Sequence, residues 1–255
     1  MSEAKDAMGT IEGWPEQGAY STAPRPPGGL GRGAARRIAL VMVLTLIMGT
    51  ILLLSAGTLG WMRAWVWLAA QGILMVVNGA ILLAVNPEVI NERGKRHQGT
   101  KKFDRILTAA ITPWYFGIPL VAGLDVVRFG WTSLPLWAMW IGLVLLSISD
   151  VFALWSMVVN RHLETSVRIQ EDRGHVVVTS GPYRLVRHPM YVGMCLQILS
   201  WPLILGSGWA LVPTLAVIVL FVVRTSLEDR TLHAELPGYG AYTLRTRYRL
   251  LPGIW

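Results

Sequence analysis

Charged residues are scarce in this chain of 255 residues, where Asp, Glu, Lys and Arg together make up 15%. Soluble globular domains carry about 25% charged residues, so a soluble single-core enzyme is disfavoured. Cysteine is scarcer still, because Cys195 stands alone and has no partner for a disulfide within the chain. A secreted domain held together by disulfides is therefore excluded. Hydrophobic residues make up 53%, and this excess indicates a membrane protein.

Long segments of the chain contain no charged residue at all. They cover residues 38–62, 64–87, 106–124, 129–149 (resuming after Asp150 to residue 160) and 189–223. A helix needs about 20 apolar residues to cross the hydrocarbon core, so the first four segments are predicted to be single spans. The fifth is too long for one span, and a Gly-Ser-Gly turn at 206–208 divides it. We therefore predict a helical hairpin whose second arm continues as helix beyond Glu228. The fold class is an all-α, multi-pass transmembrane bundle with about six spans.

Positive charge is distributed unevenly around these spans. With the N-terminus in the cytoplasm, 21 Lys and Arg residues fall on the cytoplasmic side and two, Arg63 and Arg128, fall outside. This asymmetry is typical of membrane proteins and predicts that both termini are cytoplasmic. It also explains the net charge of +8, so no nucleic-acid partner is expected. Arg outnumbers Lys by 19 to 4, a bias common in high-GC bacteria, which favours a bacterial inner membrane.

The chain divides into three parts by composition. Residues 1–37 are predicted to be a disordered cytoplasmic tail, because residues 13–33 hold four Pro and six Gly with few large apolar side chains. The glycine-rich run at 28–33 follows no strand, so it is interpreted as linker and not as a dinucleotide-binding loop. Residues 38–160 hold the first four spans, and residues 161–255 hold the remaining polar motifs. Asp150, inside the fourth span, is expected to hydrogen-bond a neighbouring helix.

A first group of polar residues precedes the predicted hairpin. A short β-branched run begins at His175, Gly181 and Pro182 break it, and Pro189 suits the first turn of the following helix. Arg187 and His188 then stand at a helix N-terminus, where the unpaired N–H groups favour a carboxylate or phosphate. The alternative is that these side chains extend to the lipid headgroups.

A second group follows the hairpin, with Glu228 and Asp229 on the last long helix and Tyr239, Tyr242 and Arg247 beyond it. Glu228 is four residues from Arg224 and could simply pair with it. Because a hairpin leaves and returns to the same side of the membrane, the two polar groups are expected to lie close together. They would then form a cytoplasmic pocket in the C-terminal third of the chain.

These residues resemble the signature of the isoprenylcysteine carboxyl methyltransferase family and of the related phospholipid methyltransferases. The resemblance covers roughly residues 160–255. It rests on residues from both polar groups: His175, Val178-Thr179-Ser180-Gly181, Tyr183, Arg187-His188-Pro189, Tyr191-Val192-Gly193, Glu228-Asp229, Gly238, Tyr239, Tyr242, Arg247 and Pro252. The chain departs from the family in having Glu-Asp in place of an acidic Glu pair.

The resemblance implies an integral membrane enzyme that uses S-adenosylmethionine to methylate a lipophilic or membrane-embedded acceptor, which by the family's name is like an isoprenylcysteine carboxylate, with no metal. The cofactor-binding residues that it implies are His175, Gly181, Tyr183, Arg187, His188, Pro189, Tyr191, Gly193, Glu228, Tyr239 and Tyr242. Arg187 and His188 are expected to bind the donor's carboxylate, and Glu228 its ribose or ammonium. Arg247 and Tyr191 are candidates for positioning the reactants, and no catalytic residue is assigned.

Two alternatives remain at this stage. The ending 247–252 also resembles membrane sterol reductases, which share the fold and use NADPH, although Glu228 and Asp229 would repel the 2′-phosphate of that cofactor. A scaffold or transporter without catalytic activity is the other alternative.

Overall fold

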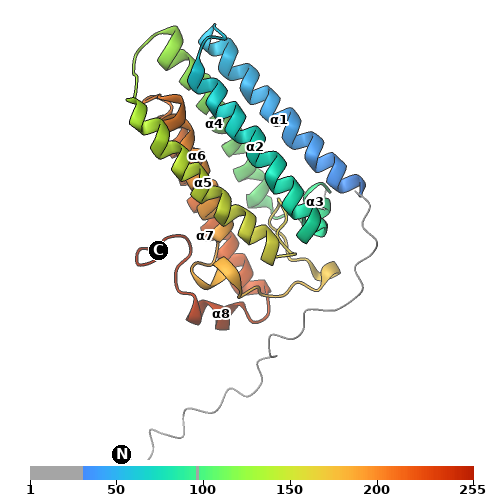
Figure 1. The fold of residues 1–255 in the computed structure, drawn as a ribbon. Coiled ribbons are helices and arrows are strands. Elements are labelled where there is room, and N and C mark those ends of the chain that lie inside the picture. The colour runs from blue at the N-terminus through green and yellow to red at the C-terminus, as the bar shows by residue number, and fades with distance from the viewer. Residues whose placement is uncertain (1–30, 96–97) are drawn as a thin grey trace, which may run out of the picture.

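The computed structural model describes residues 31–95 and 98–255, and these residues form helices and loops without a β-strand. The helices are α1 (Arg32–Ala56), α2 (Met62–Val85), α3 (Pro87–Arg93), α4 (Lys102–Gly123), α5 (Leu136–Val159), α6 (Pro189–Leu205), α7 (Leu211–Glu235) and α8 (Tyr239–Arg245), with short π or 3₁₀ turns η1 (Leu124–Arg128), η2 (Glu171–Arg173) and η3 (Gly181–Arg184). The long helices form one bundle, and α8 lies at the end of it where α7 finishes (Figure 1). The predicted all-α fold class is confirmed.

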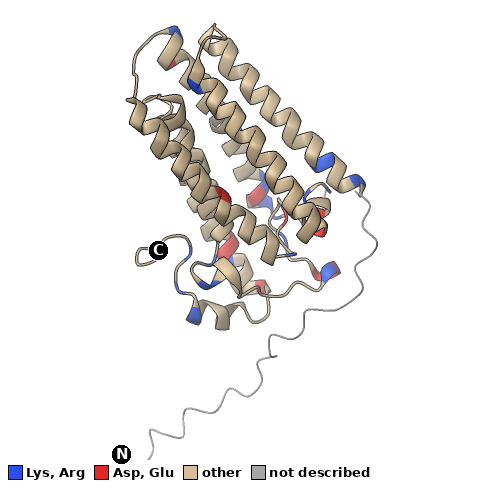
Figure 2. Cartoon of the chain, viewed as in Figure 1, with Lys and Arg blue, Asp and Glu red and all other residues tan. Residues whose placement is uncertain are grey.

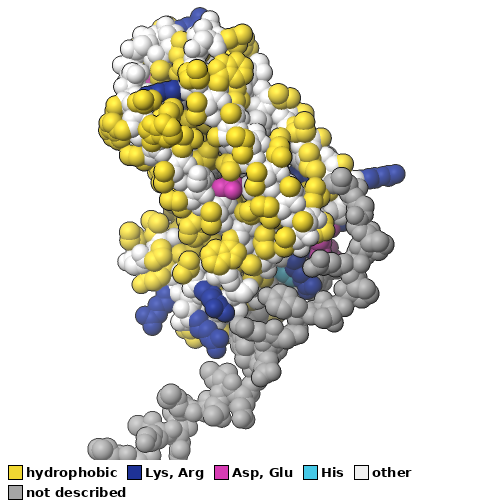
Figure 3. Space-filling view, in the orientation of Figure 1, with side chains coloured by type: hydrophobic (Ala, Val, Ile, Leu, Met, Phe, Trp, Pro, Cys, Tyr) yellow, Lys and Arg dark blue, Asp and Glu magenta, His cyan; other side chains and the backbone are white. Residues whose placement is uncertain are grey.

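Five helices are long and apolar enough to cross a membrane: α1, α2, α4 together with η1, α5 and α7. The predicted sixth, α6, is apolar but has only 17 residues, so its crossing stays a prediction. Exposed apolar side chains cover much of the bundle surface, as lipid contact requires (Figure 3). The chain is an integral membrane protein. Lys, Arg, Asp and Glu are concentrated at the end of the bundle where α3 and α8 lie (Figure 2).

The first helix begins earlier than the sequence predicted, at Arg32 instead of Ile38. Its start packs closely against α3, since a Cβ on Gly33 would lie 2.2 Å from the carbonyl oxygen of Asn91. A Cβ on Gly94 would likewise lie 1.7 Å from the carbonyl oxygen of Gly33. The interpretation of the glycine run as mere linker is therefore wrong at its end, where glycine permits two helices to touch. The tail before residue 31 lies outside the described residues.

The predicted hairpin is present, and Gly206 ends α6 with a φ of 81° that favours glycine. The carboxylate of Asp125 in η1 holds this turn. It accepts hydrogen bonds from the Ser207 hydroxyl (2.6 Å), the Trp209 N–H (3.1 Å) and the Thr132 N–H (2.8 Å). Because this turn is fixed, the start of α6 and the end of α7 lie together at the opposite end of the bundle. As predicted, α7 continues as one helix past Arg224 and Glu228.

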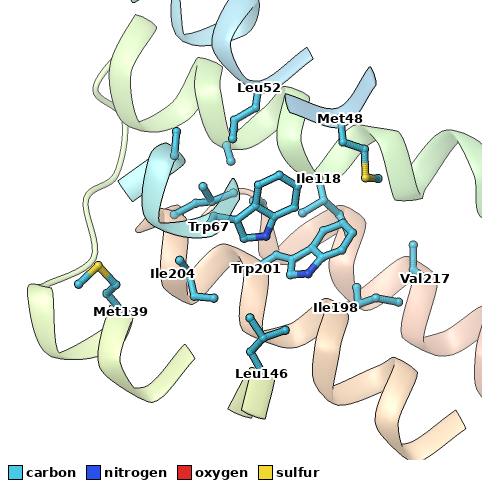
Figure 4. Close-up of a cluster of buried hydrophobic side chains, with 14 of the residues drawn as sticks. Met48, Leu52, Trp67, Ile118, Met139, Leu146, Ile198, Trp201, Ile204 and Val217 are labelled. Atoms are coloured by element: carbon cyan, nitrogen blue, oxygen red, sulfur yellow. The ribbon is translucent and has the colours of Figure 1, made fainter. Parts of the chain in front are cut away.

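Tight packing aligns α6 with its neighbours. The Trp67 and Trp201 rings meet edge to face at 5.2 Å in the core formed by the long helices (Figure 4). Nearer the start of α6, a Cβ on Gly193 would lie 2.8 Å from the Ser149 carbonyl oxygen, so glycine lets α6 approach α5. The predicted hydrogen bond of Asp150 to a neighbouring helix is also present, because Asn78 of α2 donates to it at 2.5 Å.

Candidate functional site

The two polar groups of the sequence meet at the end of the α6–α7 hairpin. The backbone N–H of Arg187 donates to the Tyr248 carbonyl (2.9 Å), and that of His188 donates to the Arg249 carbonyl (3.0 Å). The N-terminus of α6 is thereby fastened to the segment after α8. The expectation that the hairpin brings both groups together is confirmed. The β-branched run that begins at His175 forms no strand and is an irregular segment.

Asp229 of α7 is the centre of this junction. Its buried carboxylate accepts two hydrogen bonds from the Arg187 guanidinium (2.8 and 3.0 Å) and one from Arg249 (2.8 Å). The Tyr239 hydroxyl donates to it at 2.9 Å, and His188 Nε2 lies 3.2 Å away. The sequence assigned Arg187 and His188 to a ligand carboxylate. In the structure their partner is a carboxylate of the protein itself.

Glu228, the neighbouring acid, occupies a different environment. The Tyr191 hydroxyl donates to its Oε2 atom, and within the described residues no other group hydrogen-bonds to this carboxylate. The alternative that Glu228 pairs with Arg224 is wrong, because Arg224 binds Asp104 of α4 at 2.7 Å. The Arg224 guanidinium also lies over the Tyr191 ring, 5.5 Å from its centroid. Glu228 is thus left with free hydrogen-bonding capacity.

Buried tyrosines join the remaining parts of the site. Tyr183 of η3 accepts a hydrogen bond from Asn160 (2.8 Å) on its hydroxyl, and its carbonyl accepts one from the Tyr242 hydroxyl (2.7 Å). Burial raises the pKa of Tyr183 and that of Tyr242 well above the ordinary value of a tyrosine. Both hydroxyls are therefore neutral hydrogen-bonding groups.

A cavity of about 270 Å³ lies between these groups. This volume is close to the lower end of the range for small-molecule sites, roughly 300–1,000 Å³. Eight of the residues predicted to form the site line it: His175, Tyr183, Arg187, His188, Tyr191, Glu228, Tyr239 and Tyr242. The polar residues and tyrosines of both sequence groups therefore face one space.

Four other predicted residues do not line this cavity. Gly181 has a φ of +58°, and a Cβ there would lie 2.8 Å from the Trp155 indole nitrogen. Gly193 packs against α5, and Pro189 begins α6. Arg247 is exposed, and its carbonyl accepts a hydrogen bond from Arg187 (2.8 Å). The first three shape the backbone around the site.

Sequence reasoning missed part of the cavity wall. Arg37 of α1 and Arg93 of α3 line it, as do Asn160 and His162 after α5. No motif marks either arginine in the sequence, because each stands next to a span, where positive charge is explained by membrane orientation. The cavity thus draws on the N-terminal helices as well as on the C-terminal third.

The His175 and His162 rings lie side by side on the cavity wall, with centroids 4.8 Å apart and planes tilted by 35°. Burial, reinforced by His162 and two nearby arginines, lowers the pKa of His175 from 6.5 to about 4. The pKa of His162 is lowered in the same direction, mainly by burial. Both imidazoles are therefore neutral at pH 7.

This pKa shift predicts how stability depends on pH. Between pH 6.5 and 4 the unfolded chain binds a proton at His175 and the folded protein does not, so stability falls as the pH falls. At pH 5 the loss amounts to at most about 2 kcal/mol. Thermal unfolding in detergent at pH 7 and pH 5 should show a smaller difference for His175→Gln than for the wild type. Equal differences in both proteins would show that His175 does not carry this pH dependence.

Comparison with known proteins places this geometry in context. Residues 137–236 match the family model described as phospholipid methyltransferase. The cobalt-zinc-cadmium resistance protein CzcN of Cupriavidus metallidurans is 33% identical over 113 residues, which are 42% of this chain and 45% of CzcN. The match therefore spans less than half the length of this curated relative.

A solved structure extends the comparison to most of the chain. The eukaryotic intramembrane Ras methyltransferase ICMT (isoprenylcysteine carboxyl methyltransferase) aligns with a TM-score of 0.51 at 19% identity, covering 87% of this chain and 75% of that one. At this identity the likeness shows the fold. The resemblance read from the sequence is thus confirmed: residues 137–236 match the phospholipid methyltransferase family, and the chain has the fold of isoprenylcysteine carboxyl methyltransferase.

Proposed function

We propose that this chain is a membrane methyltransferase that uses S-adenosylmethionine to methylate a lipophilic acceptor. The observation that carries the proposal is the cavity at the end of the α6–α7 hairpin, where Glu228 keeps free acceptor capacity among buried tyrosines. Much of this cavity wall belongs to the region that matches the phospholipid methyltransferase family. The fold shared with a membrane methyltransferase supports the same conclusion.

The chemistry of the cavity fits such a donor. S-adenosylmethionine carries an ammonium, ribose hydroxyls and a sulfonium, which a carboxylate and aromatic rings attract. Glu228 would accept hydrogen bonds from the ammonium or the ribose, while Tyr183, Tyr191, Tyr239 and Tyr242 would wall the adenine and the sulfonium. Arg187 and His188, fixed by Asp229, would close one end of the cavity.

When bound, the donor supplies a methyl group whose C–S bond breaks, leaving the electron pair on sulfur while a lone pair of the acceptor forms the new bond. The protein's contribution is to position the two molecules and exclude water. The buried junction around Asp229 gives that positioning a rigid base. The neutral His175 offers a ring nitrogen for hydrogen bonding without adding charge beside a cationic donor.

The orientation proposed for the membrane follows from the same geometry. The cavity lies at the end of the bundle where the first residues of α6 and the last residues of α7 meet. The distribution of Lys and Arg favours a cytoplasmic location for this end, and the excess of Arg over Lys favours a bacterial inner membrane. A water-soluble donor would then enter from the cytoplasm and the acceptor from the bilayer.

Calorimetry on the protein in detergent tests the proposed function. S-adenosylhomocysteine, the product of the donor, is expected to bind saturably and more tightly than NADPH, since Glu228 attracts the ammonium of the first and repels the phosphates of the second. Saturable binding of NADPH together with no binding of S-adenosylhomocysteine would replace the methyltransferase with a reductase. Absence of binding for both would favour a scaffold or transporter.

A further inference from the structure

A second hollow, separate from the cavity, adjoins the Asp229 junction. It is an open groove of about 570 Å³ between the last turns of α7 and the chain from α8 onward. Arg187 is the one residue that lines both this groove and the cavity. Its ion pair with Asp229 therefore lies between the two spaces, and a ligand of the groove would not share the space proposed for the methyl donor.

The groove carries more positive charge than its acid can balance. Four arginines line it, against the single carboxylate of Asp229. Asp229 already binds two of them, Arg187 and Arg249. The other two, Arg230 and Arg247, are exposed, and in the part of the chain that the structure describes neither side chain has an ion pair or a hydrogen bond. Two positive charges therefore line the groove without a counter-ion.

The arginines of the groove are suited to a phosphate group. A guanidinium is planar and can donate two parallel hydrogen bonds to two oxygens of one phosphate. Arg249 binds Asp229 through Nε at 2.8 Å, and its side chain is 29% exposed, so its terminal N–H groups can reach the groove. The Trp255 ring holds this guanidinium in place from 5.0 Å. Arg230, Arg247 and Arg249 can thus act together on one anion.

The length of α7 places the groove at the level of the lipid headgroups. This spanning helix begins at Leu211, just after the fixed turn at the other end of the bundle. At about 1.5 Å per residue, Arg230 lies about 29 Å further along the helix axis. The hydrocarbon core of a membrane is about 30 Å thick. Arg230 therefore lies where the hydrocarbon ends and the phosphate groups begin.

Apolar side chains near the arginines favour a lipid over a soluble anion. Leu244, Leu251 and Ile254 are exposed, and they are interspersed with arginines along the last part of the chain. Figure 3 shows basic side chains beside apolar ones at the end of the bundle where α8 lies. Exposed apolar and basic side chains together are typical of segments that rest on an anionic membrane surface.

We propose that the groove binds the phosphate of an anionic phospholipid, with Arg230 and Arg247 as its main cations. The bound anion neutralises their charges and gains charge-assisted hydrogen bonds. Because Arg230 belongs to α7 and Arg247 follows α8, the lipid ties these two segments together. Arg247, a sequence candidate for positioning the reactants, is thereby assigned to the lipid. The site involves no methyl transfer, so it can be tested apart from the proposed function.

Native mass spectrometry of the full-length protein in a neutral detergent measures the first lipid that binds. The probe is phosphatidylglycerol, whose headgroup is anionic. Phosphatidylcholine with the same acyl chains is the comparison, because it carries the same phosphate beside a choline cation. Glycerol 3-phosphate, which has no acyl chains, is added as a competitor to separate a lipid site from a site for a soluble phosphate.

We expect phosphatidylglycerol to bind the wild type roughly tenfold more tightly than phosphatidylcholine. Arg230→Gln and Arg247→Gln should each weaken phosphatidylglycerol binding about fivefold, since one basic residue at an anionic surface contributes about 1 kcal/mol. Arg184→Gln is the matched control, because Arg184 is exposed, lies three residues before Arg187 and does not line the groove. Without lipid, all three variants should melt like the wild type, because each changes an exposed side chain.

Three results would overturn the inference. The wild type could bind phosphatidylglycerol and phosphatidylcholine equally, which would exclude a site for the anionic headgroup. Arg184→Gln could weaken phosphatidylglycerol binding as much as Arg230→Gln does, which would assign the effect to the general positive charge of this end. Glycerol 3-phosphate could displace the lipid at an equal concentration, and the groove would then be a site for a soluble phosphate.

Discussion

Replacing Asp229 with alanine is expected to destabilise the folded protein by about 3–5 kcal/mol, because it leaves buried cations without their partner. Arg187 and Arg249 both bind this carboxylate, and Tyr239 donates to it. For a chain of this size, such a loss lowers the thermal midpoint in detergent by roughly 6–20 °C. Because Asp229 also joins α6, α7 and α8, the affinity for S-adenosylhomocysteine should fall as well.

Glu235→Gln is the matched control for this variant. Glu235 lies on the same helix, is exposed, and forms a surface ion pair with Lys101 at 2.7 Å. Exposed pairs contribute about 0–1 kcal/mol, so this variant should melt within roughly 4 °C of the wild type. An Asp229→Ala protein that melted as high as Glu235→Gln would show that the buried junction adds little stability.

The large stability effect expected at Asp229 could not be read from the sequence. From helix geometry, Asp229 lies about 100° around α7 from Glu228, so the two adjacent acids cannot occupy the same position. Which of two adjacent acids meets the basic start of α6 depends on how α7 is rotated in the bundle. That rotation is set by packing among helices, and the local sequence does not encode it.

The spans and the hairpin, in contrast, were predictable. Absence of charge over some 20 residues has one main physical cause, which is the hydrocarbon core of the membrane. The Gly-Ser-Gly turn could be read in the same way, because Gly206 adopts a backbone conformation that glycine favours. The start of α1 could not be predicted, because the contact of Gly33 with Asn91 and Gly94 depends on a helix some 60 residues away in the chain.

Long-range ion pairs explain the remaining errors at the site. Arg224 has an acid four residues along its own helix, and the sequence offers that pairing as the simple alternative. The structure pairs it with Asp104, which is 120 residues away, and this releases Glu228 to face the cavity. Arg37 and Arg93 were overlooked for a related reason, because charges that flank spans are expected for orientation alone.

Replacing Glu228 with glutamine is expected to weaken binding of S-adenosylhomocysteine roughly tenfold to a hundredfold while the fold survives. Charge-assisted hydrogen bonds contribute about 1.5–3 kcal/mol each, and about 1.4 kcal/mol corresponds to a decade in affinity. Glutamine is nearly isosteric, and its carbonyl oxygen can still accept the hydrogen bond from Tyr191. Calorimetry of the variant, beside a thermal melt without ligand, measures both effects.

Comparison with Asp229→Asn makes this result specific to one carboxylate. Asp229 already has four partners within the protein. Removing its charge should therefore lower the thermal midpoint, and the affinity for S-adenosylhomocysteine should fall as a consequence. Glu228→Gln should show the reverse order, with a melt close to that of Glu235→Gln and a clear loss of affinity. Unchanged affinity in Glu228→Gln would remove this residue from the donor site. Both variants could instead lose the same affinity without a change in melting. The negative field of the acidic pair would then attract the ligand, and no direct hydrogen bond to Glu228 would be involved.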